Sequence, residues 1–197
     1  RTIAELNGIS CIALEEVLPD KKQIYCTRSF GQKPTELQPI LEAVSLYASR
    51  AAEKLRLQKS YVHAIHVFLN TSPHQSNYYS NSTVVQLPCA TDDTRQIVAA
   101  AKHALRQLYR PGYAYLKAGV GLIHISAKKH YQQDIFHRQQ DSRTDALVAV
   151  LDAVNRRYGG GTAFVAATGT QKPWRMRQAF RSPAYVCRWP DIPVVSC

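Results

Sequence analysis

The sequence predicts an α+β protein: a βαββαβ unit, the split βαβ or ferredoxin-like arrangement, followed by a smaller mixed α/β C-terminal extension. Three observations predict this fold. Four segments before residue 127 are rich in β-branched and aromatic residues. Two segments between them carry apolar residues at helical spacing. After Ala127 the chain becomes polar and then basic, which indicates a separate part.

The first strand is expected over 23–30, because this segment is β-branched and aromatic and ends at Gly31. A long helix should follow, and Thr35 and Gln38 match a capping box at its start. One helical face would carry Leu37, Ile40, Leu41, Val44, Ala48, Ala51 and Leu55.

The second strand is expected over 61–70, where the nearly continuous apolar character indicates a central position in the sheet. The polar segment 71–81 predicts a loop, and a short third strand over 83–87 should end before Pro88. Either Thr91 or Asp92 can cap the second helix. Its apolar face would carry Ile97, Ala101, Ala104, Leu105 and Leu108, and Pro111-Gly112 would end it.

The fourth strand alternates between two faces. Leu116, Ala118, Val120 and Leu122 fall on one face, and Tyr115, Lys117, Gly119 and Gly121 fall on the other. With both helices covering the first face, the second would stay open. Small residues there would allow the close approach of another backbone, as a phosphate chain needs.

The extension is expected to begin with a third helix. Ser142 and Asp145 match a capping box, and Leu147, Val150, Leu151 and Val154 would share one face. Gly159–Gly161 should end this helix, and 162–167 resembles a strand. We therefore expect a linker over 1–22, the βαββαβ domain over 23–127, a second linker over 128–143 and the extension over 144–197.

Charge and composition limit the classes of function. The net charge is +11: residues 1–127 hold 14 basic and 9 acidic residues, and residues 128–197 hold 11 and 5. A positive field spread over both parts indicates a polyanion partner, usually nucleic acid. No membrane-spanning segment or signal peptide is evident, so no membrane partner is expected. The five cysteines form no CxxC pair, which argues against a zinc ribbon and favours free thiols in a reducing cytosol.

Several short segments in order along the chain carry a family resemblance. They are Glu5-Leu6-Asn7-Gly8, Ala13-Leu14-Glu15-Glu16-Val17, Thr27-Arg28-Ser29-Phe30-Gly31, Ala51-Ala52-Glu53-Lys54-Leu55-Arg56, Lys117-Ala118-Gly119-Val120, Ala149-Val150-Leu151-Asp152, Ser182-Pro183-Ala184-Tyr185 and Arg188-Trp189-Pro190-Asp191-Ile192-Pro193. With these marks the chain resembles the little-finger domain and C-terminal extension of UmuC-type Y-family translesion DNA polymerases.

The resemblance implies a parent polymerase whose palm, fingers and thumb lie upstream and whose palm carboxylates hold two magnesium ions. In this chain the adjacent acidic pairs are Glu15-Glu16 and Asp92-Asp93. Neither has a partner Asp on a neighbouring strand, as two-metal chemistry requires. We therefore expect no catalytic residue, metal or cofactor in this chain and no polymerase activity from it alone. The resemblance also implies error-prone synthesis in the SOS response, in the cytoplasm of a bacterium at the nucleoid.

The resemblance implies that the little finger grips primer–template DNA through its backbone. The expected contacts are Arg28, Ser29, Phe30 and Gly31 in the first-strand motif, Thr71 and Ser72 after the second strand, and Lys117 and Gly119 in the fourth. Such contacts position a duplex without reading its sequence. Side chains alternate along a strand, so Arg28 would lie on the same face as the apolar Ile24 and Cys26. Its exposure would then require a bulge.

Gln132-Gln133-Asp134-Ile135-Phe136 resembles the short motif by which bacterial polymerases dock on the sliding clamp. Gln132 would bind a polar rim, and Ile135 and Phe136 would enter an apolar cleft. Gln133 and Ile135 depart from the usual pattern. The alternative is that Ile135 and Phe136 pack on the extension itself.

Residues 172–189 interleave basic and aromatic side chains without an acid. The candidate contacts are Arg175, Arg177, Arg181 and Trp189. They could hold single-stranded nucleic acid by stacking. The resemblance favours partners instead, namely a UmuD-type accessory subunit and the recombinase filament, and a packing role stays open.

Two other classes of function stay open. One is a free-standing ferredoxin-like RNA-binding module that stacks bases on Phe68, Tyr113 and Tyr115, although the glycine–aromatic signature is missing. The other is a protein-interaction scaffold. His63 and His66 are three residues apart on a strand, which predicts opposite faces and no shared metal.

Overall fold

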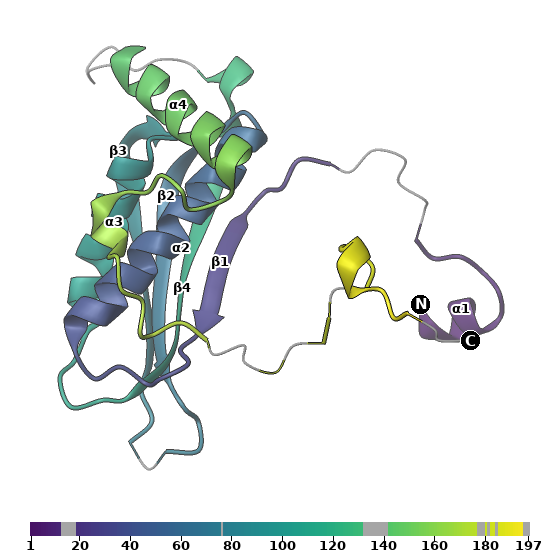
Figure 1. Cartoon of the computed structure of the whole chain (residues 1–197), viewed down its shortest axis with the longest axis horizontal. Helices are drawn as coiled ribbons and strands as arrows, with labels where there is room; N and C mark the ends of the chain where they lie inside the picture. Colours follow the sequence, from purple (N-terminus) through teal and green to yellow (C-terminus); the bar gives the residue numbers. More distant parts are fainter. Residues whose placement is uncertain are drawn as a thin grey trace.

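A computed structural model describes residues 1–12, 19–75, 77–131, 142–176, 180, 182–183 and 185–194 (Figure 1). The helices and strands are α1 (Thr2–Leu6), β1 (Ile24–Ser29), α2 (Leu37–Leu57), β2 (Ser60–Thr71), β3 (Ser80–Thr91), α3 (Thr94–Leu108), β4 (Tyr115–Ala127) and α4 (Ser142–Tyr158). Short 3-10 turns lie at Lys128–His130, Ala166–Thr168 and Trp189–Asp191. Among the described helices, none has the length and apolar character to cross a membrane.

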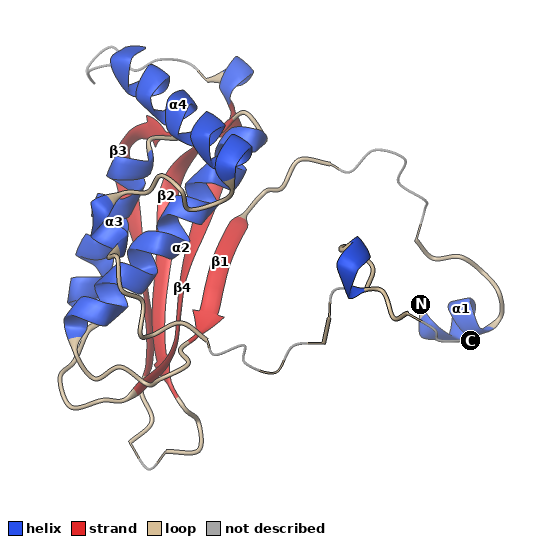
Figure 2. Ribbon diagram, in the orientation of Figure 1, coloured by secondary structure: helices blue, strands red, loops and turns tan. Residues whose placement is uncertain are grey.

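The four strands form one antiparallel sheet in the order β1-β4-β2-β3. Strand β4 therefore lies between β1 and β2, and β2 lies between β3 and β4, so both βαβ units are split. Helices α2 and α3 cover one face of the sheet and leave the other open (Figure 2). The predicted βαββαβ arrangement is confirmed.

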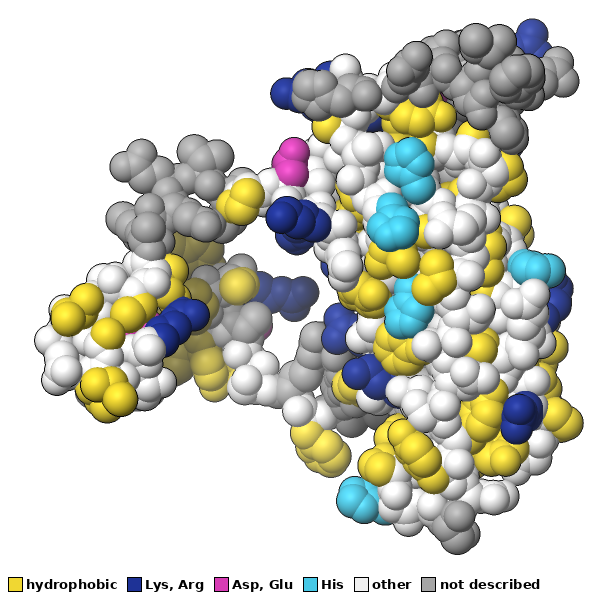
Figure 3. Space-filling model, turned by 180° about the vertical axis from the view of Figure 1, so that it is seen from behind, with side chains coloured by type: hydrophobic (Ala, Val, Ile, Leu, Met, Phe, Trp, Pro, Cys, Tyr) yellow, Lys and Arg dark blue, Asp and Glu magenta, His cyan; other side chains and the backbone are white. Residues whose placement is uncertain are grey.

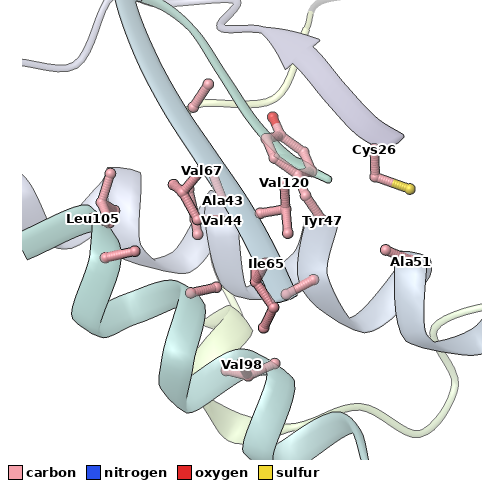
Figure 4. Packing of buried hydrophobic residues seen from close by; sticks show 14 of the residues in the cluster. Cys26, Ala43, Val44, Tyr47, Ala51, Ile65, Val67, Val98, Leu105 and Val120 are labelled. Atoms are coloured by element: carbon pink, nitrogen blue, oxygen red, sulfur yellow. The ribbon is translucent and has the colours of Figure 1, made fainter. Parts of the chain in front are cut away.

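The core lies between the sheet and its two helices, as Figure 4 shows. Helix α2 contributes Ile40, Val44, Ala48 and Ala51, which follow the expected helical stripe and are fully buried. Across from them lie the inward side chains of the central strands, including Ile65, Val67 and Val120. This apolar burial fixes which face of the sheet is left for function.

The expected helix caps were wrong at both helices of this domain. Helix α2 starts after Glu36 without any side-chain cap, so the capping box of Thr35 and Gln38 is absent. Gln38 instead donates to Glu42 Oε1 at 3.2 Å. Helix α3 is capped by Asp93, whose Oδ1 accepts from the Arg95 amide at 2.9 Å.

Strand β3 is longer than expected and continues past Pro88 to Thr91. Two features allow a proline there. Strand β3 is an edge strand, and its pairing shifts near Pro88, since Val62 pairs with Thr91 while Ala64 pairs with Gln86. Proline has no amide hydrogen to donate to a neighbouring strand, so it is tolerated in an edge strand at a bulge, where that hydrogen bond is not needed.

The same irregularity corrects the prediction for His63 and His66. Val62 and Ile65, three residues apart, both belong to the buried core, so the alternation of faces is interrupted between them. Both histidines consequently lie on the open face: His66 contacts Tyr25, and His63 hydrogen-bonds Ser126 Oγ at 2.9 Å. Neighbouring His124 in β4 has a φ of 53°, which marks the distortion on the paired strand.

Helix α4 has the predicted extent but not the predicted buried face. Val148 is buried, whereas Leu147 and Val150 are 52% and 61% exposed. The reason is that Asp152, one turn after Val148, faces Arg56 of α2 and orients the helix. The strand expected over 162–167 was also wrong: the described residues of this segment form irregular backbone and a 3-10 turn.

Candidate nucleic-acid interface

Histidines and hydrophobic side chains lie together on the open face of the sheet (Figure 3). Among them are aromatic rings from β1 and β2, the strands on either side of β4. The Tyr25 hydroxyl lies 3.3 Å from His66 Nδ1, and the two rings meet edge to face with centroids 5.9 Å apart. The Phe68 ring follows, 6.0 Å from His66. The rings therefore form a continuous surface across β1 and β2.

Two glycines of β4 make room for these rings. A Cβ on Gly119 would lie 2.4 Å from the Phe68 ring, and a Cβ on Gly121 would lie 2.2 Å from the Tyr25 ring. Such contacts are impossible without movement of the rings. The expectation that these glycines admit another backbone was therefore wrong, because the chain's own side chains occupy the space.

Lys117 lies in β4 at the Phe68 end of this surface. Its backbone pairs with Ser29 in β1 and with Asn70 in β2, and its side chain is exposed. Its Nζ is 6.0 Å from the Phe68 ring centroid, so the ammonium stands beside the rings. The predicted position of Lys117 on the open face agrees with this geometry.

A second group of rings lies at the other end of β2 and was missed by sequence reasoning. The Tyr61 and Tyr131 rings meet at 5.2 Å, and Lys128 Nζ lies 4.7 Å from the Tyr61 centroid. Burial raises the pKa of the Tyr61 hydroxyl, while Lys128 lowers it. No local pattern in the sequence could have found this group, because it depends on the pairing of Tyr61 with Ser126, which places 128–131 beside Tyr61.

The first-strand motif is mostly engaged within the protein. Phe30 is buried and donates its amide to Leu116 O at 2.8 Å. Gly31 donates its amide to Trp174 O at 3.0 Å, and a Cβ on it would lie 2.2 Å from the Arg175 carbonyl oxygen. Phe30 and Gly31 thus offer no free amide to a phosphate in this structure, which corrects that part of the prediction.

Arg28 is exposed, but on the helix-covered side of β1 rather than on the open face. Strand β1 pairs with β4 without a bulge, so Arg28 keeps the parity of Ile24 and Cys26. Its exposure comes from a cavity at this end of β1, lined also by Tyr47 and Arg50 of α2. The expected bulge is therefore not needed.

The two hydroxyls after β2 are also occupied. Thr71 is buried, and its Oγ1 accepts from the Tyr79 amide at 2.8 Å and donates to the Tyr79 carbonyl at 3.2 Å. Ser72 Oγ accepts from the His74 amide at 3.4 Å. Thr71 holds the β2–β3 connection and is not placed to bind DNA.

The aromatic pattern of an RNA-binding module is not present. Of its three candidate residues, Phe68 lies on the open face, whereas Tyr115 is completely buried and Tyr113 packs against Tyr79. Tyr115 reaches the core because the β2–β4 register shifts between Asn70 and Thr71. The expected alternation of β4 therefore fails at its first residue.

The acidic pair that the structure describes serves the fold. Asp92 Oδ2 lies 2.5 Å from Lys128 Nζ, and Asp93 caps α3. Within the described residues, no group of three or more His, Cys, Asp or Glu side chains could hold a metal ion.

The remaining candidates lie in the tail. The clamp-type motif (Gln132, Ile135 and Phe136) lies outside the described residues, as do Arg177 and Arg181. Arg175 is exposed beside β1, and Trp189 is 87% exposed. Trp174 is instead buried against Tyr47, so it packs the core and cannot stack a base.

Residues 21–135 match the impB/mucB/samB family C-terminal domain. The chain belongs to the impB/mucB/samB family. Residues 145–195 match a second family, a domain of unknown function designated DUF4113. The resemblance stated from the sequence motifs is thereby confirmed.

Curated relatives match along almost the whole chain. It is 42% identical to protein ImpB of Salmonella typhimurium over 197 residues, which cover 98% of this chain and 46% of that protein. It is 40% identical to protein UmuC of Salmonella typhimurium strain LT2 over 195 residues, 98% of this chain and 46% of that protein. The chain thus spans about half the length of these relatives.

Among solved structures, an insertion ternary complex of Dbh DNA polymerase aligns with a TM-score of 0.46 and 14% identity, covering 54% of this chain and 29% of that chain. A Y-family DNA polymerase chimera of Dbh and Dpo4 aligns with a TM-score of 0.43 and 15% identity, covering 64% of this chain and 34% of that chain.

Proposed function

We propose that this chain is the C-terminal part of a Y-family translesion DNA polymerase and that the open face of its sheet grips primer–template DNA. Family membership supports the parent enzyme. The observation that carries the DNA grip is the charge of the sheet: its four strands contain no Asp or Glu, while Lys117 and three histidines lie in them.

An acid-free face suits a phosphate backbone because no carboxylate repels it. Lys117 supplies a point charge, and the rings of Tyr25, His66 and Phe68 supply a flat apolar surface beside it. None of these groups is arranged in the bidentate manner that reads base edges. The proposed binding is therefore independent of base sequence, which suits synthesis across damaged bases.

We also propose that catalysis and its magnesium ions belong to parts of the parent protein outside this chain. The described carboxylates at 92–93 support this proposal, since one pairs with Lys128 and the other caps a helix. Clamp docking through Gln132, Ile135 and Phe136, binding of a UmuD-type subunit and of the recombinase filament, and action in the bacterial SOS response are further proposals. They are supported by the sequence resemblance.

The DNA grip is tested by titrating a fluorescent primer–template duplex with the chain and following anisotropy at several salt concentrations. Lys117→Ala should weaken binding and reduce the slope of log affinity against log salt by about 1. The matched control is Lys102→Ala, which removes the same charge from α3 on the opposite side of the sheet. If both variants lost the same DNA affinity, the loss would reflect the change in net charge alone and would contradict the proposed surface.

Clamp docking is tested separately with immobilised sliding clamp. Phe136→Ala should abolish retention of the chain, because the aromatic anchor of such motifs carries most of the binding energy. Phe180→Ala is the control, since Phe180 is exposed outside the motif. Retention that survives Phe136→Ala would contradict docking through this motif.

A further inference from the structure

Three arginines from separate segments line one cavity on the helix-covered side of β1. Arg28 belongs to β1, Arg50 to α2, and Arg175 to the segment that crosses Gly31. The cavity measures about 500 Å3, and among its described lining residues none is acidic; the others are Ser29, Leu46, Tyr47, Trp174 and Met176.

None of the three arginines forms an ion pair within the described part of the chain. The ion pairs found there involve other basic residues, and none reaches Arg28, Arg50 or Arg175. By contrast, Arg56, which follows Arg50 further along α2, forms an ion pair with Asp152. Like charges held around one hollow repel each other, and an anion inside it would remove that repulsion.

The electrostatic effect of this cluster extends to its neighbours. Burial lowers the pKa of the Lys172 ammonium, and Arg175 and Arg50 lower it further. Lys172 lines an adjoining cavity of about 240 Å3 that shares Arg50 and Arg175 with the first. The adjoining cavity is also lined by Arg56 and by the carboxylates of Glu53 and Asp152, so the uncompensated positive charge belongs to the arginine-lined cavity.

Trp174 forms part of the wall of the arginine-lined cavity. Its side chain is 4% exposed and lines the cavity, and its indole Nε1–H is buried without a hydrogen-bond partner among the described residues. Because this N–H is closed off from solvent, it lies behind the wall of the cavity, and Trp174 serves as a fluorescent reporter of the cavity rather than as a donor to its occupant.

We propose that this cavity binds a phosphate-bearing anion. Guanidinium groups recognise phosphate through parallel hydrogen bonds, and the several oxygens of a phosphate can accept from donors that converge from different directions. The Ser29 hydroxyl adds a further donor at the rim. The site lies across β1 from the face assigned to DNA and does not depend on that assignment. Its phosphate can come from a nucleic-acid backbone or from a free polyphosphate.

The test is a titration of the full chain carrying Trp189→Phe with inorganic triphosphate at constant ionic strength. Trp174 is then the only tryptophan, because the sequence has two. Its emission should change saturably. Arg50→Gln should raise the dissociation constant about tenfold, since it removes charge-assisted hydrogen bonds.

The matched control is Arg106→Gln, which removes the same charge from the exposed side of α3. It should leave the dissociation constant within about twofold, the change expected for a screened charge outside the site. Circular dichroism would verify that each variant is folded. Equal weakening by Arg106→Gln and Arg50→Gln, or a response that never saturates, would overturn the site.

A competition experiment identifies the source of the phosphate. Triphosphate that displaces a fluorescent duplex from wild type but not from Arg50→Gln supports binding of backbone phosphate. Simultaneous binding of duplex and triphosphate supports a free polyphosphate. A saturable response to hexaglutamate with none to triphosphate would overturn the phosphate assignment and indicate an acidic protein segment.

Discussion

Arg56 and Asp152 join the two parts of the chain through a two-point ion pair. Arg56 Nε lies 2.6 Å from Asp152 Oδ2, and Arg56 Nη2 lies 2.7 Å from Oδ1. The remaining nitrogen, Nη1, donates to Asp92 O and to Thr94 Oγ1, both at 2.9 Å. One guanidinium thus connects α2, the start of α3 and α4.

Asp152→Ala should release α4 from the sheet domain. The side chains of the pair are 10% and 15% exposed, and removing one partner of a largely buried pair costs about 3 kcal/mol because the other charge stays behind. Hydrogen exchange of α4 amides should accelerate while β2 and β4 keep their protection. Asp145→Ala, a carboxylate near the exposed start of the same helix, is the control. Unchanged exchange in α4 would show that other contacts hold the helix.

Tyr47 should make the domain less stable at high pH. Burial raises its pKa to about 12, although Arg28 and Arg50 act in the opposite direction. Between pH 10 and 12 the unfolded tyrosine loses its proton while the folded one keeps it, so the stability present below pH 10 declines. The slope is about 1.4 kcal/mol per pH unit. Urea unfolding at several pH values would measure this.

Tyr47→Phe provides the control for that pH dependence. Phenylalanine keeps the ring packed against Trp174 but has no proton to lose. Its stability should therefore fall less steeply above pH 10 than that of wild type. Parallel slopes would show that other tyrosines, such as buried Tyr115, dominate the alkaline transition.

Gly31→Ala should displace the segment that carries Trp174 and Arg175. A Cβ at this position meets backbone, the Arg175 carbonyl oxygen at 2.2 Å, and backbone cannot turn aside as a side chain can. Tryptophan emission should shift to the red as Trp174 becomes hydrated. Gly160→Ala is the control, since its added Cβ would meet nothing within 4 Å. An unshifted spectrum would contradict the close approach.

Asp93→Ala should destabilise α3 by about 1 kcal/mol, since it removes the side chain that caps the first turn. Asp93→Asn should recover most of this loss, because an amide oxygen can also accept from the Arg95 amide. Chemical unfolding of the three proteins would give the comparison. A loss in Asp93→Asn equal to that in Asp93→Ala would assign the effect to charge rather than to capping.

Periodicity predicted the order of the principal helices and strands, although β3 is longer than its expected range of 83–87. Both α2 and α3 bury the residues that their helical spacing indicated, such as Ile40 and Ile97. The central position of β2 was predicted from its nearly continuous apolar character and is confirmed. The order of the other strands could not be predicted, because it depends on which strand edges meet in the folded chain. The bulge near Ala64 was equally hidden, since an interruption of alternation depends on the partner strand.

The candidate site was predicted in part for the same reason. Lys117 could be placed on the open face because Ala118, Val120 and Leu122, which follow it on the other face, are buried as expected. The role of Gly31 depends on Trp174, which is distant in the sequence, and that of Thr71 depends on Tyr79 across the β2–β3 connection. Neither contact could be predicted from a local pattern. The arginine-lined cavity is formed by three segments that meet only in the folded chain, so no single segment predicted it.

The pairing of β1 with β4 has a consequence for synthesis on the ribosome. Strand β1 is made first, yet its partner in the sheet is the last strand of the domain. Until Leu122 has left the exit tunnel, β1 lacks its partner strand, and its apolar Ile24 and Cys26 stay uncovered by the sheet. Strand pairs of this long-range kind form slowly, and apolar surface stays exposed until they have formed. The nascent domain therefore depends on translation reaching β4 before aggregation can compete.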